Sequence, residues 1–396
     1  MRMSLQSRRE YLRKMQERYR KAKTRAEKSH ILDEVVHVLG YHRKHAIQVL
    51  AGKTTILNST TRKRHRPIMY QEALPVIQLV WQTLDYPCAE RLHPVLLKTA
   101  EHLAAHGVIT LSEQVRQQLA QISRATLARR IAQWRSPKPQ RKAVSSSRSI
   151  SKLRSEIPVA VYDWDESKPG ALEIDLVEHN GGSTLGHYAY TLNVVDIVSG
   201  YSRRRAFLGR SQAVVFQALT LILSEWPVTP WGLHSDNGSE FFNGLLLRFC
   251  RQHGFELTRS RPYRKNDNAH VEQKNRQFVR EVVGYERYDT PEAVEWLNEV
   301  YACLDPYANF FLPMRKVIAK ERHGVKVRKT FDQAKVPFDR LVEAGVLTPE
   351  TRKRLDKERQ ALNPLDLHQR LETLLALGPS SFSTKQEIEE RDLVFV

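Results

Sequence analysis

The sequence predicts a multidomain protein: an all-α N-terminal region, an α/β core with a mixed sheet, and a mainly helical C-terminal region. Three observations support this order. Apolar residues recur at helical spacing in the first third, strand-like patterns begin near residue 172, and helical spacing returns after residue 305. At 396 residues the chain can form two or three domains. We expect domains at 1–135, 158–304 and 305–396, with a linker rich in Pro, Ser and Lys at 136–157.

Positive charge is concentrated at one end of the chain. The 63 Lys and Arg residues outnumber the 44 Asp and Glu residues and give a net charge of +19. Residues 1–150 contain 29 basic and 10 acidic residues and carry the whole excess, because residues 151–396 contain 34 of each. A solvated basic surface explains such one-sidedness poorly. The pattern predicts a nucleic-acid partner.

Cysteine spacing and hydropathy indicate the cellular compartment and argue against some kinds of metal site. The cysteines are far apart and form no CxxC pair: Cys88, Cys250 and Cys303. Neither a disulfide framework nor a thiolate zinc site is expected. The nearby histidines lack zinc-finger intervals as well: His93, His102 and His106. No apolar run approaches the ~18 residues of a membrane span. We therefore expect a cytoplasmic, nucleoid-associated protein with no membrane partner.

Two segments of the N-terminal region predict helix-turn-helix units, at 29–50 and 111–135. In the first, Gly40 separates two apolar-periodic helices, and the second helix has Ala46, Ile47 and Leu50 on its apolar side. The residues that we expect to face DNA are polar or basic and lie off the apolar stripes: Arg43, Lys44, His45, Gln48, Arg124, Arg129 and Arg130. Two such units predict bipartite reading of double-stranded DNA, and the alternative is a helical bundle with basic exposed faces.

Charged segments beside these units have less specific interpretations. The first ~28 residues form a charged helix that would be a phosphate-binding arm or a solvated one. The basic loop RKRHRP (62–67) suits phosphate contact.

The core is expected to contain five strands. The first is 172–179, and 187–209 gives two more joined at Ser199-Gly200. A helix at 212–225, a strand ending near Asp236, a helix at 243–253, a strand at 255–261 and a helix at 267–284 follow. A meander followed by helix-strand alternation predicts a mixed sheet.

The C-terminal region is expected to be mainly helical. Thr348-Pro349 and Asn363-Pro364 predict helix starts, with a capping residue followed by proline. VKVRKTF (325–331) between them and the core is interpreted as a lone basic strand or arm.

Three acidic residues lie at positions from which their side chains could meet. Asp175 is inside the first strand, Asp236 is at the end of the fourth, and Glu272 is on the last helix. If these strands are neighbours, the three side chains can converge. Convergent carboxylates repel one another unless cations join them, so the set predicts hard divalent ions. Two Mg²⁺ ions, or Mn²⁺ in their place, would suit phosphoryl transfer.

Other acidic residues near these positions have competing interpretations. Asp163 or Asp165 could replace Asp175 as the first carboxylate. Asp196 precedes a turn and is expected to be structural, and Glu240 is assigned to the loop after Asp236.

The last helix of the core has two faces. The residues at four-residue intervals share one face: Asn268, Glu272, Arg276 and Arg280. Arg276 and Arg280 would hold DNA phosphates, and the alternative is an ion pair from Glu272 to Arg276. Lys274 and Asn275 are expected as flanking DNA contacts. The residues expected to meet the sheet are apolar: Val271, Phe278 and Val282.

These motifs carry a family resemblance. Asp236 and Glu272 are separated by 35 residues, and the words SDNGSEF and SRPYRKNDNAHVEQKNRQF surround them. The set resembles the D,D(35)E signature of integrase-core insertion-sequence transposases and retroviral integrases. The resemblance is close over 160–320 and looser over the helix-turn-helix N-terminus. The sequence differs from retroviral integrases at both ends. The His/Cys zinc module of their N-terminal region is missing, and a lone strand cannot close the small barrel of their C-terminal region.

The resemblance implies a ribonuclease-H-like core and Mg²⁺-dependent strand cleavage at an element end. The freed 3′-hydroxyl then attacks target DNA, with no covalent protein intermediate. Asp175 and Asp236 would be metal ligands, with Asp175 bridging two ions, and Glu272 would complete the second site. The protein would act as a homo-oligomer that pairs two element ends. Two alternatives are a catalytically idle, domesticated transposase that regulates through DNA binding, and a nuclease that hydrolyses without joining.

Overall fold

The computed structural model describes six stretches of the chain: 3–53, 70–134, 168–235, 244–259, 269–324 and 326–380. Several sequence predictions lie outside them: the loop 62–67, the linker 136–157, Asp163, Asp165, Asp236, Glu240 and Asn268. The chain divides into two compact units, residues 1–69 and 70–396. In the described stretches, every helix is too short or too polar to cross a bilayer.

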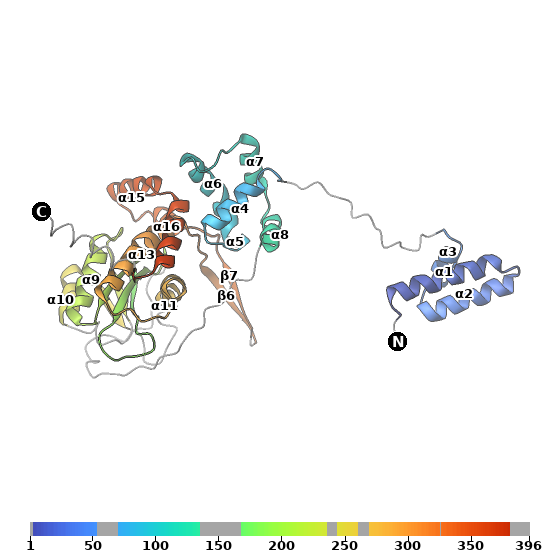
Figure 1. Ribbon diagram of the computed structural model, residues 1–396, viewed down its shortest axis with the longest axis horizontal. Helices are drawn as coiled ribbons and strands as arrows, with labels where there is room; N and C mark the ends of the chain where they lie inside the picture. Colours follow the sequence, from blue (N-terminus) through green and yellow to red (C-terminus); the bar gives the residue numbers. More distant parts are fainter. Residues whose placement is uncertain are drawn as a thin grey trace. The chain divides into compact units, whose positions relative to one another are not determined.

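The small unit consists of α1 (Leu5–Lys21), α2 (Arg25–Leu39) and α3 (Arg43–Leu50) (Figure 1). Its core joins residues from all three helices: Leu12, Met15, Ile31, Leu32, Val35, Leu39, Ala46, Val49 and Leu50. A capping box between Thr24 and Glu27 starts α2, and Gly40, with φ +68°, ends it. The charged N-terminal helix is therefore part of a packed three-helix unit.

The buried face of α3 differs from the sequence prediction. Ala46, Val49 and Leu50 are buried, whereas Ile47 is 40% exposed. Ala46 and Val49 lie three residues apart on one face, and Ile47 is turned about 100° away from Ala46. The assignment of Ile47 to the core was wrong.

The large unit begins with short helices that surround one end of its core. They are α4 (Leu74–Thr83), α5 (Ala89–Leu92), η1 (His93–Val95), α6 (Leu96–Ala105), α7 (Glu113–Gln121) and α8 (Arg124–Trp134). Their buried side chains share a core with the later helices. His102 Nε2, for example, lies 2.8 Å from the carbonyl oxygen of Leu362. The two predicted helix-turn-helix segments thus belong to different units.

The five-stranded sheet has the order β3-β2-β1-β4-β5. Its strands are β1 (Ala171–Glu178), β2 (Ala189–Asp196), β3 (Ser202–Leu208), β4 (Gly232–Ser235) and β5 (Glu256–Arg259). β1 to β3 form an antiparallel meander, while β1 pairs in parallel with β4 and β4 with β5. This confirms the predicted mixed sheet and the neighbouring positions of the first and fourth strands.

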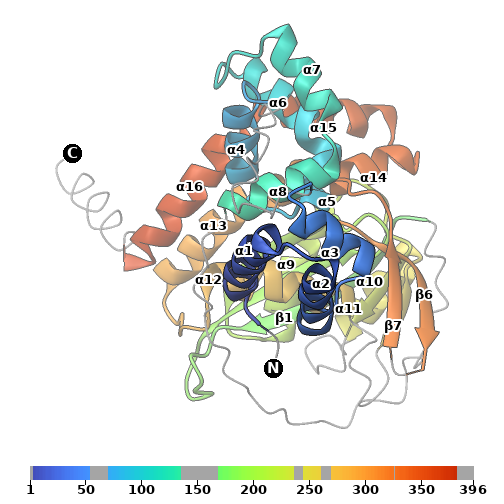
Figure 2. The same cartoon turned by 90° about the vertical axis from the view of Figure 1, so that its right-hand side faces the viewer.

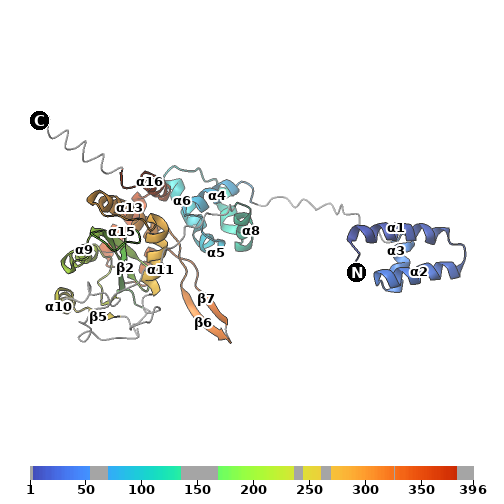
Figure 3. The same ribbon diagram turned by 60° about the horizontal axis from the view of Figure 1, so that its bottom comes forward.

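Successive residues of β1 face different helices. Leu172 and Ile174 join the core formed with α9 (Gln212–Ser224) and α10 (Gly244–His253). Val177 joins the core on the other side, which includes α13 (Pro291–Phe310). Figures 1 and 3 show α9 and α11 on opposite sides of the sheet. Because strand side chains alternate, Glu173 and Asp175 point to the same side as Val177.

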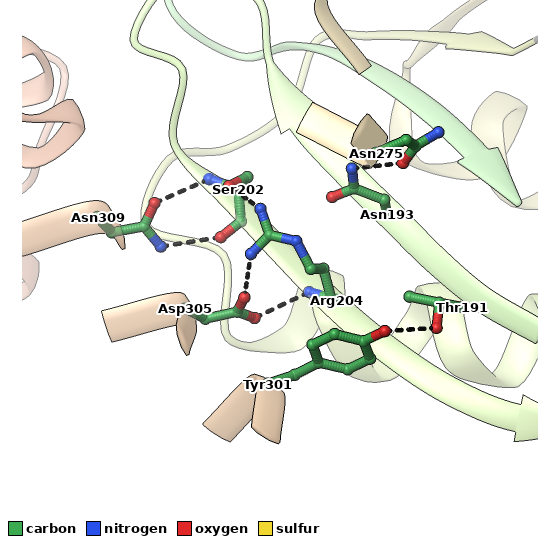
Figure 4. A network of polar contacts seen from close by, with 8 residues as sticks. All are labelled: Thr191, Asn193, Ser202, Arg204, Asn275, Tyr301, Asp305 and Asn309. Atoms are coloured by element: carbon green, nitrogen blue, oxygen red, sulfur yellow. Dashed lines mark hydrogen bonds and ion pairs between the residues drawn. The ribbon is translucent and has the colours of Figure 1, made fainter. Parts of the chain in front are cut away.

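Side chains of α13 cover the open edge of β3 (Figure 4). Asn309 accepts the N–H of Ser202 at 3.0 Å and donates to its carbonyl oxygen at 2.8 Å. Asp305 accepts the N–H of Arg204 at 2.8 Å and also pairs with its guanidinium. These bonds satisfy backbone groups that a further strand would otherwise pair with. The helix runs across residues 304 and 305, where the sequence placed a domain boundary.

After α13 the chain forms a two-stranded antiparallel ribbon, β6 (Val317–His323) and β7 (Lys326–Phe331). The prediction of a lone strand was wrong, because the polar segment before it provides a partner. Three helices follow: α14 (Pro337–Glu343), α15 (Pro349–Ala361) and α16 (Pro364–Leu377). The predicted starts of the last two are confirmed, since Thr348 and Asn363 each cap a helix with proline in its first turn.

Candidate active site

The carboxyl ends of β1 and β4 define the candidate site. The last described pair in their parallel register is Ile174 and Ser235. In the sequence these two residues immediately precede Asp175 and Asp236. Asp236 lies outside the described residues. Asp175 is 8% exposed and faces the helix α11 (Ala269–Lys274), which carries Glu272.

Both oxygens of Asp175 accept hydrogen bonds. Oδ1 accepts the N–H of Leu176 at 2.9 Å, and Oδ2 accepts Nδ2 of Asn275 at 2.8 Å. Asn275 is itself held by Asn193, which donates to its Oδ1 at 2.7 Å and is the cross-strand partner of Asp175 (Figure 4). Asn275 is buried, and its contact with DNA stays a prediction. In this structure the two amides fix the orientation of the Asp175 carboxylate.

Glu173 is a further carboxylate of the site. It is fully buried, and its Oε2 accepts the N–H of Val271 at 2.7 Å. It thereby satisfies one of the backbone N–H groups that the first turn of a helix leaves open. Sequence analysis did not single it out, although its position two residues before Asp175 places both side chains on one face of a strand.

The ionisation of Glu173 reflects the charge of this site. Burial raises the pKa of Glu173 to about 8, although hydrogen bonds from the N–H groups of Val271 and His270 act to lower it. The negative charges of Asp175 and Glu272 also raise this pKa. Glu173 therefore lies close enough to both carboxylates to sense their charge.

The helix that carries Glu272 changes geometry within the site. α11 continues into the π-helical segment η3 (Asn275–Arg280) and then α12 (Glu281–Val283). Asn275, the partner of Asp175, is the first residue of the π segment, and such segments are frequent at functional sites. Beyond this segment Val283 is buried, and the predicted core residue Val282 is partly buried against the same core.

The basic residues predicted to contact DNA on this helix have different environments. Lys274 is 7% exposed, its Nζ lies 4.7 Å from the ring centroid of Phe278, and burial lowers its pKa to about 7. Its contact with DNA stays a prediction, and in this structure its ammonium group packs against the ring of Phe278. Arg280 is partly buried and donates to the carbonyl oxygen of Glu178 at 2.7 Å. Arg276 is exposed and pairs with Glu281 at 3.1 Å.

Most of the residues predicted to face DNA on α3 and α8 are solvent-exposed. On α3 these are Arg43, Lys44, His45 and Gln48, and on α8 they are Arg124 and Arg129, with Arg130 partly exposed. Arg43 also pairs with Asp33 and donates to Ser29 at 2.7 Å, so it has a structural role as well.

Asp196 is structural, as the sequence predicted. Its Oδ1 accepts the N–H and the hydroxyl of Ser199, each at 2.6 Å, and its Oδ2 accepts the N–H of Gly170 at 2.6 Å. These bonds hold the turn between β2 and β3.

The donor chemistry of the site suits a hard cation. Within the described stretches, which do not include Asp236, no three His, Cys, Asp or Glu side chains form a ready metal cluster. The described carboxylates of Asp175 and Glu272 offer the oxygen ligands that Mg²⁺ prefers. Their combined negative charge, sensed at Glu173, is of the kind that a cation would relieve.

Comparison with known proteins places the fold in a family. A family model described as integrase core domain matches residues 165–265, a range that includes Asp175 and Asp236 and ends before Glu272. The uncharacterized protein y4rM of Sinorhizobium fredii (strain NBRC 101917 / NGR234) is 36% identical over 343 residues, which cover 86% of this chain and 96% of that protein. This chain belongs to the integrase-like superfamily.

Solved structures similar to this integrase-like chain include retroviral catalytic cores. The HTLV-2 integrase catalytic core domain in complex with magnesium (dimeric form) is 14% identical, with a TM-score of 0.28, over 37% of this chain and 90% of that one. The catalytic core domain of BIV integrase is 16% identical, with a TM-score of 0.28, over 44% of this chain and 95% of that one.

Proposed function

We propose that this chain is a DNA transposase that binds insertion-sequence ends, cleaves a strand there and transfers the freed 3′-hydroxyl to target DNA. The observation that carries the proposal is the meeting of Glu173, Asp175 and the helix of Glu272 beside the parallel pair β1 and β4. A simple structural role explains this poorly, because buried carboxylates are costly unless they are paired or bound to metal.

The residues of the site have distinct roles in this proposal. Asp175, Asp236 and Glu272 would hold two Mg²⁺ or Mn²⁺ ions, which when bound supply positive charge to the attacking and leaving oxygens of the phosphodiester. Asn275 orients Asp175, and Glu173 anchors the first turn of the helix that bears Glu272. Arg276 lies two helical turns after Ala269, the first residue of α11. Its side chain is exposed and can hold a DNA phosphate.

DNA recognition is assigned to the two helical segments outside the sheet. The exposed basic faces of α3 and α8 suit the major groove of double-stranded DNA, each as the second helix of a helix-turn-helix unit. Because they lie in different compact units, they can engage separate stretches of one element end. We propose that the protein acts as a homo-oligomer that pairs two such ends.

The test compares wild type with Glu272→Gln on a labelled duplex that carries the element end, with Mg²⁺ or Mn²⁺. The control is Glu281→Gln, which removes an exposed carboxylate from the same helical run. We expect wild type and the control to nick and join the DNA, and Glu272→Gln to bind without doing either. If wild type binds but never cuts with either metal, the proposal fails and a DNA-binding regulator replaces it. Cutting without joining would indicate a nuclease.

A further inference from the structure

The described side chains of the β6–β7 ribbon form no core of their own. Its described side chains are exposed on both faces, and these include four large apolar ones: Val317 (37%), Ile318 (65%), Val327 (52%) and Phe331 (40%). Figures 1 and 3 show it extending away from the sheet of the large unit, and Figure 2 shows its two strands side by side. An isolated two-stranded hairpin is only marginally stable in water. A partner that covers such a ribbon would therefore stabilise it.

The base of the ribbon, by contrast, is firmly attached. Lys316 Nζ donates to the carbonyl oxygens of Ile197 and Val198 at 2.7 and 2.6 Å, and its N–H donates to Asp332 at 2.7 Å. Just before the ribbon, Met314 Sδ lies 3.9 Å from Nζ of Lys274. The direction of the ribbon is therefore set by the turn between β2 and β3 and by the helix that carries Glu272.

On one face of the ribbon, every charged residue is basic. In the strand register Lys320 is opposite Lys329 and Arg322 is opposite Val327, so these four side chains share a face. Like charges directly opposite one another destabilise a strand pair, and an anion between them would relieve this. This local excess occurs in the part of the chain, 151–396, that has 34 basic and 34 acidic residues.

The other face carries charges of both signs, and the register also places His323 opposite Lys326 there. Glu321 is opposite Arg328, which gives an attractive cross-strand pair. The two faces thus differ in charge, and the difference indicates which one would meet a polyanion.

We propose that this ribbon binds duplex DNA through the face of Lys320, Arg322 and Lys329. A two-stranded ribbon fits the major groove, which is about 12 Å wide. Its cations would contact phosphates, while Val327 would lie against the groove. The inference rests on the proposed function, because it adds a third DNA contact to an enzyme that already holds DNA at its helices and at its carboxylates.

The experiment measures how salt weakens binding of the full-length protein to a fluorescent duplex. Each lost phosphate contact lowers the slope of log affinity against log salt by about 0.9, so Lys320→Ala with Lys329→Ala should reduce it by about 2. The matched control removes two exposed lysines of α15, Lys353→Ala with Lys357→Ala, and should leave the slope unchanged. Lys320→Arg with Lys329→Arg should also retain the wild-type slope.

Sedimentation and cleavage measurements on the same variants separate the possible results. The inference is overturned if the Lys320→Ala, Lys329→Ala variant keeps the wild-type slope. If that variant also changes its oligomeric state in sedimentation, the ribbon is a contact between copies of the chain. Failure of wild type to cut DNA, combined with the expected loss of slope, would overturn the proposed function and leave the ribbon's role standing. The substituted residues are exposed, so matching thermal unfolding curves can establish that the variants are folded.

Discussion

Asn275 Nδ2 lies 2.8 Å from Oδ2 of Asp175, and this contact joins the helix of Glu272 to the central strand of the sheet. Asn193, on the neighbouring strand, donates from its Nδ2 to Oδ1 of Asn275 at 2.7 Å. The two amides thus orient the Asp175 carboxylate. Partners of this kind determine how well a metal ligand is positioned.

The first prediction concerns Asn275→Ala. Removing the amide releases Asp175 Oδ2, and we expect divalent-metal affinity or strand cleavage to fall by about 10- to 100-fold. Metal titration followed by cleavage kinetics measures both effects. Gln273→Ala, an exposed change on the same helix, serves as the control. Equal kinetics for the two variants would show that Asn275 does not position Asp175.

The second prediction concerns Glu173 and has a defined sign with pH. Its pKa is raised to about 8 in the folded state, above the value of about 4.3 for an unfolded glutamate. The stability it contributes is full below pH ~4.3 and is lost as pH rises towards 8. Glu173→Gln cannot ionise, so we expect its free energy of unfolding to decline less than that of wild type over this range. Urea denaturation in a chelator measures this, and parallel pH profiles would contradict it.

Much of the core could be predicted from sequence because its signals are local. The alternation in 172–179 and the turn at Ser199-Gly200 correspond closely to β1 and to the β2–β3 meander. The apolar stripe of α7 and α8 was also predicted, since Val115 and Leu127 are buried. Local periodicity is enough for such elements.

The remaining features depend on contacts between distant segments. Lys274 has the sequence features of a surface cation, yet Phe278 and the packing around it bury its ammonium group. The π turn that begins at Asn275 shifts the helical register, and a four-residue spacing rule cannot anticipate it. Glu173 acquires its role only when Val271, 98 residues away in the chain, packs against β1.

The third prediction concerns His179 at low pH. Burial lowers its pKa to about 3, and its Nε2 lies 2.8 Å from the hydroxyl of Thr191. An unfolded histidine takes up a proton near pH 6.5, so between about 6.5 and 3 this group lowers stability as pH falls, by up to ~1.4 kcal/mol per pH unit. We expect His179→Gln to remove that component. Urea midpoints at neutral and mildly acidic pH, compared for both proteins, test it; the same acid sensitivity in both would refute it.

The last prediction concerns the pair that seals the edge of the sheet. Asp305→Ala leaves the guanidinium of Arg204, whose side chain is 0% exposed, buried without its carboxylate partner. Removing one member of a buried pair costs about 3–5 kcal/mol, so a large drop in the free energy of unfolding is expected. The guanidinium carbon of Arg204 also lies 4.8 Å from the ring centroid of Phe278, so the loss should loosen the helix that carries Glu272.

The control for this pair replaces both partners. Arg204→Met with Asp305→Leu removes both charges, and we expect it to be more stable than Asp305→Ala alone, because no unpaired charge remains buried. A double-mutant cycle by urea denaturation gives the coupling between the two residues. If Asp305→Ala costs less than about 1 kcal/mol, within the range of an exposed ion pair, then the edge of β3 does not depend on this contact.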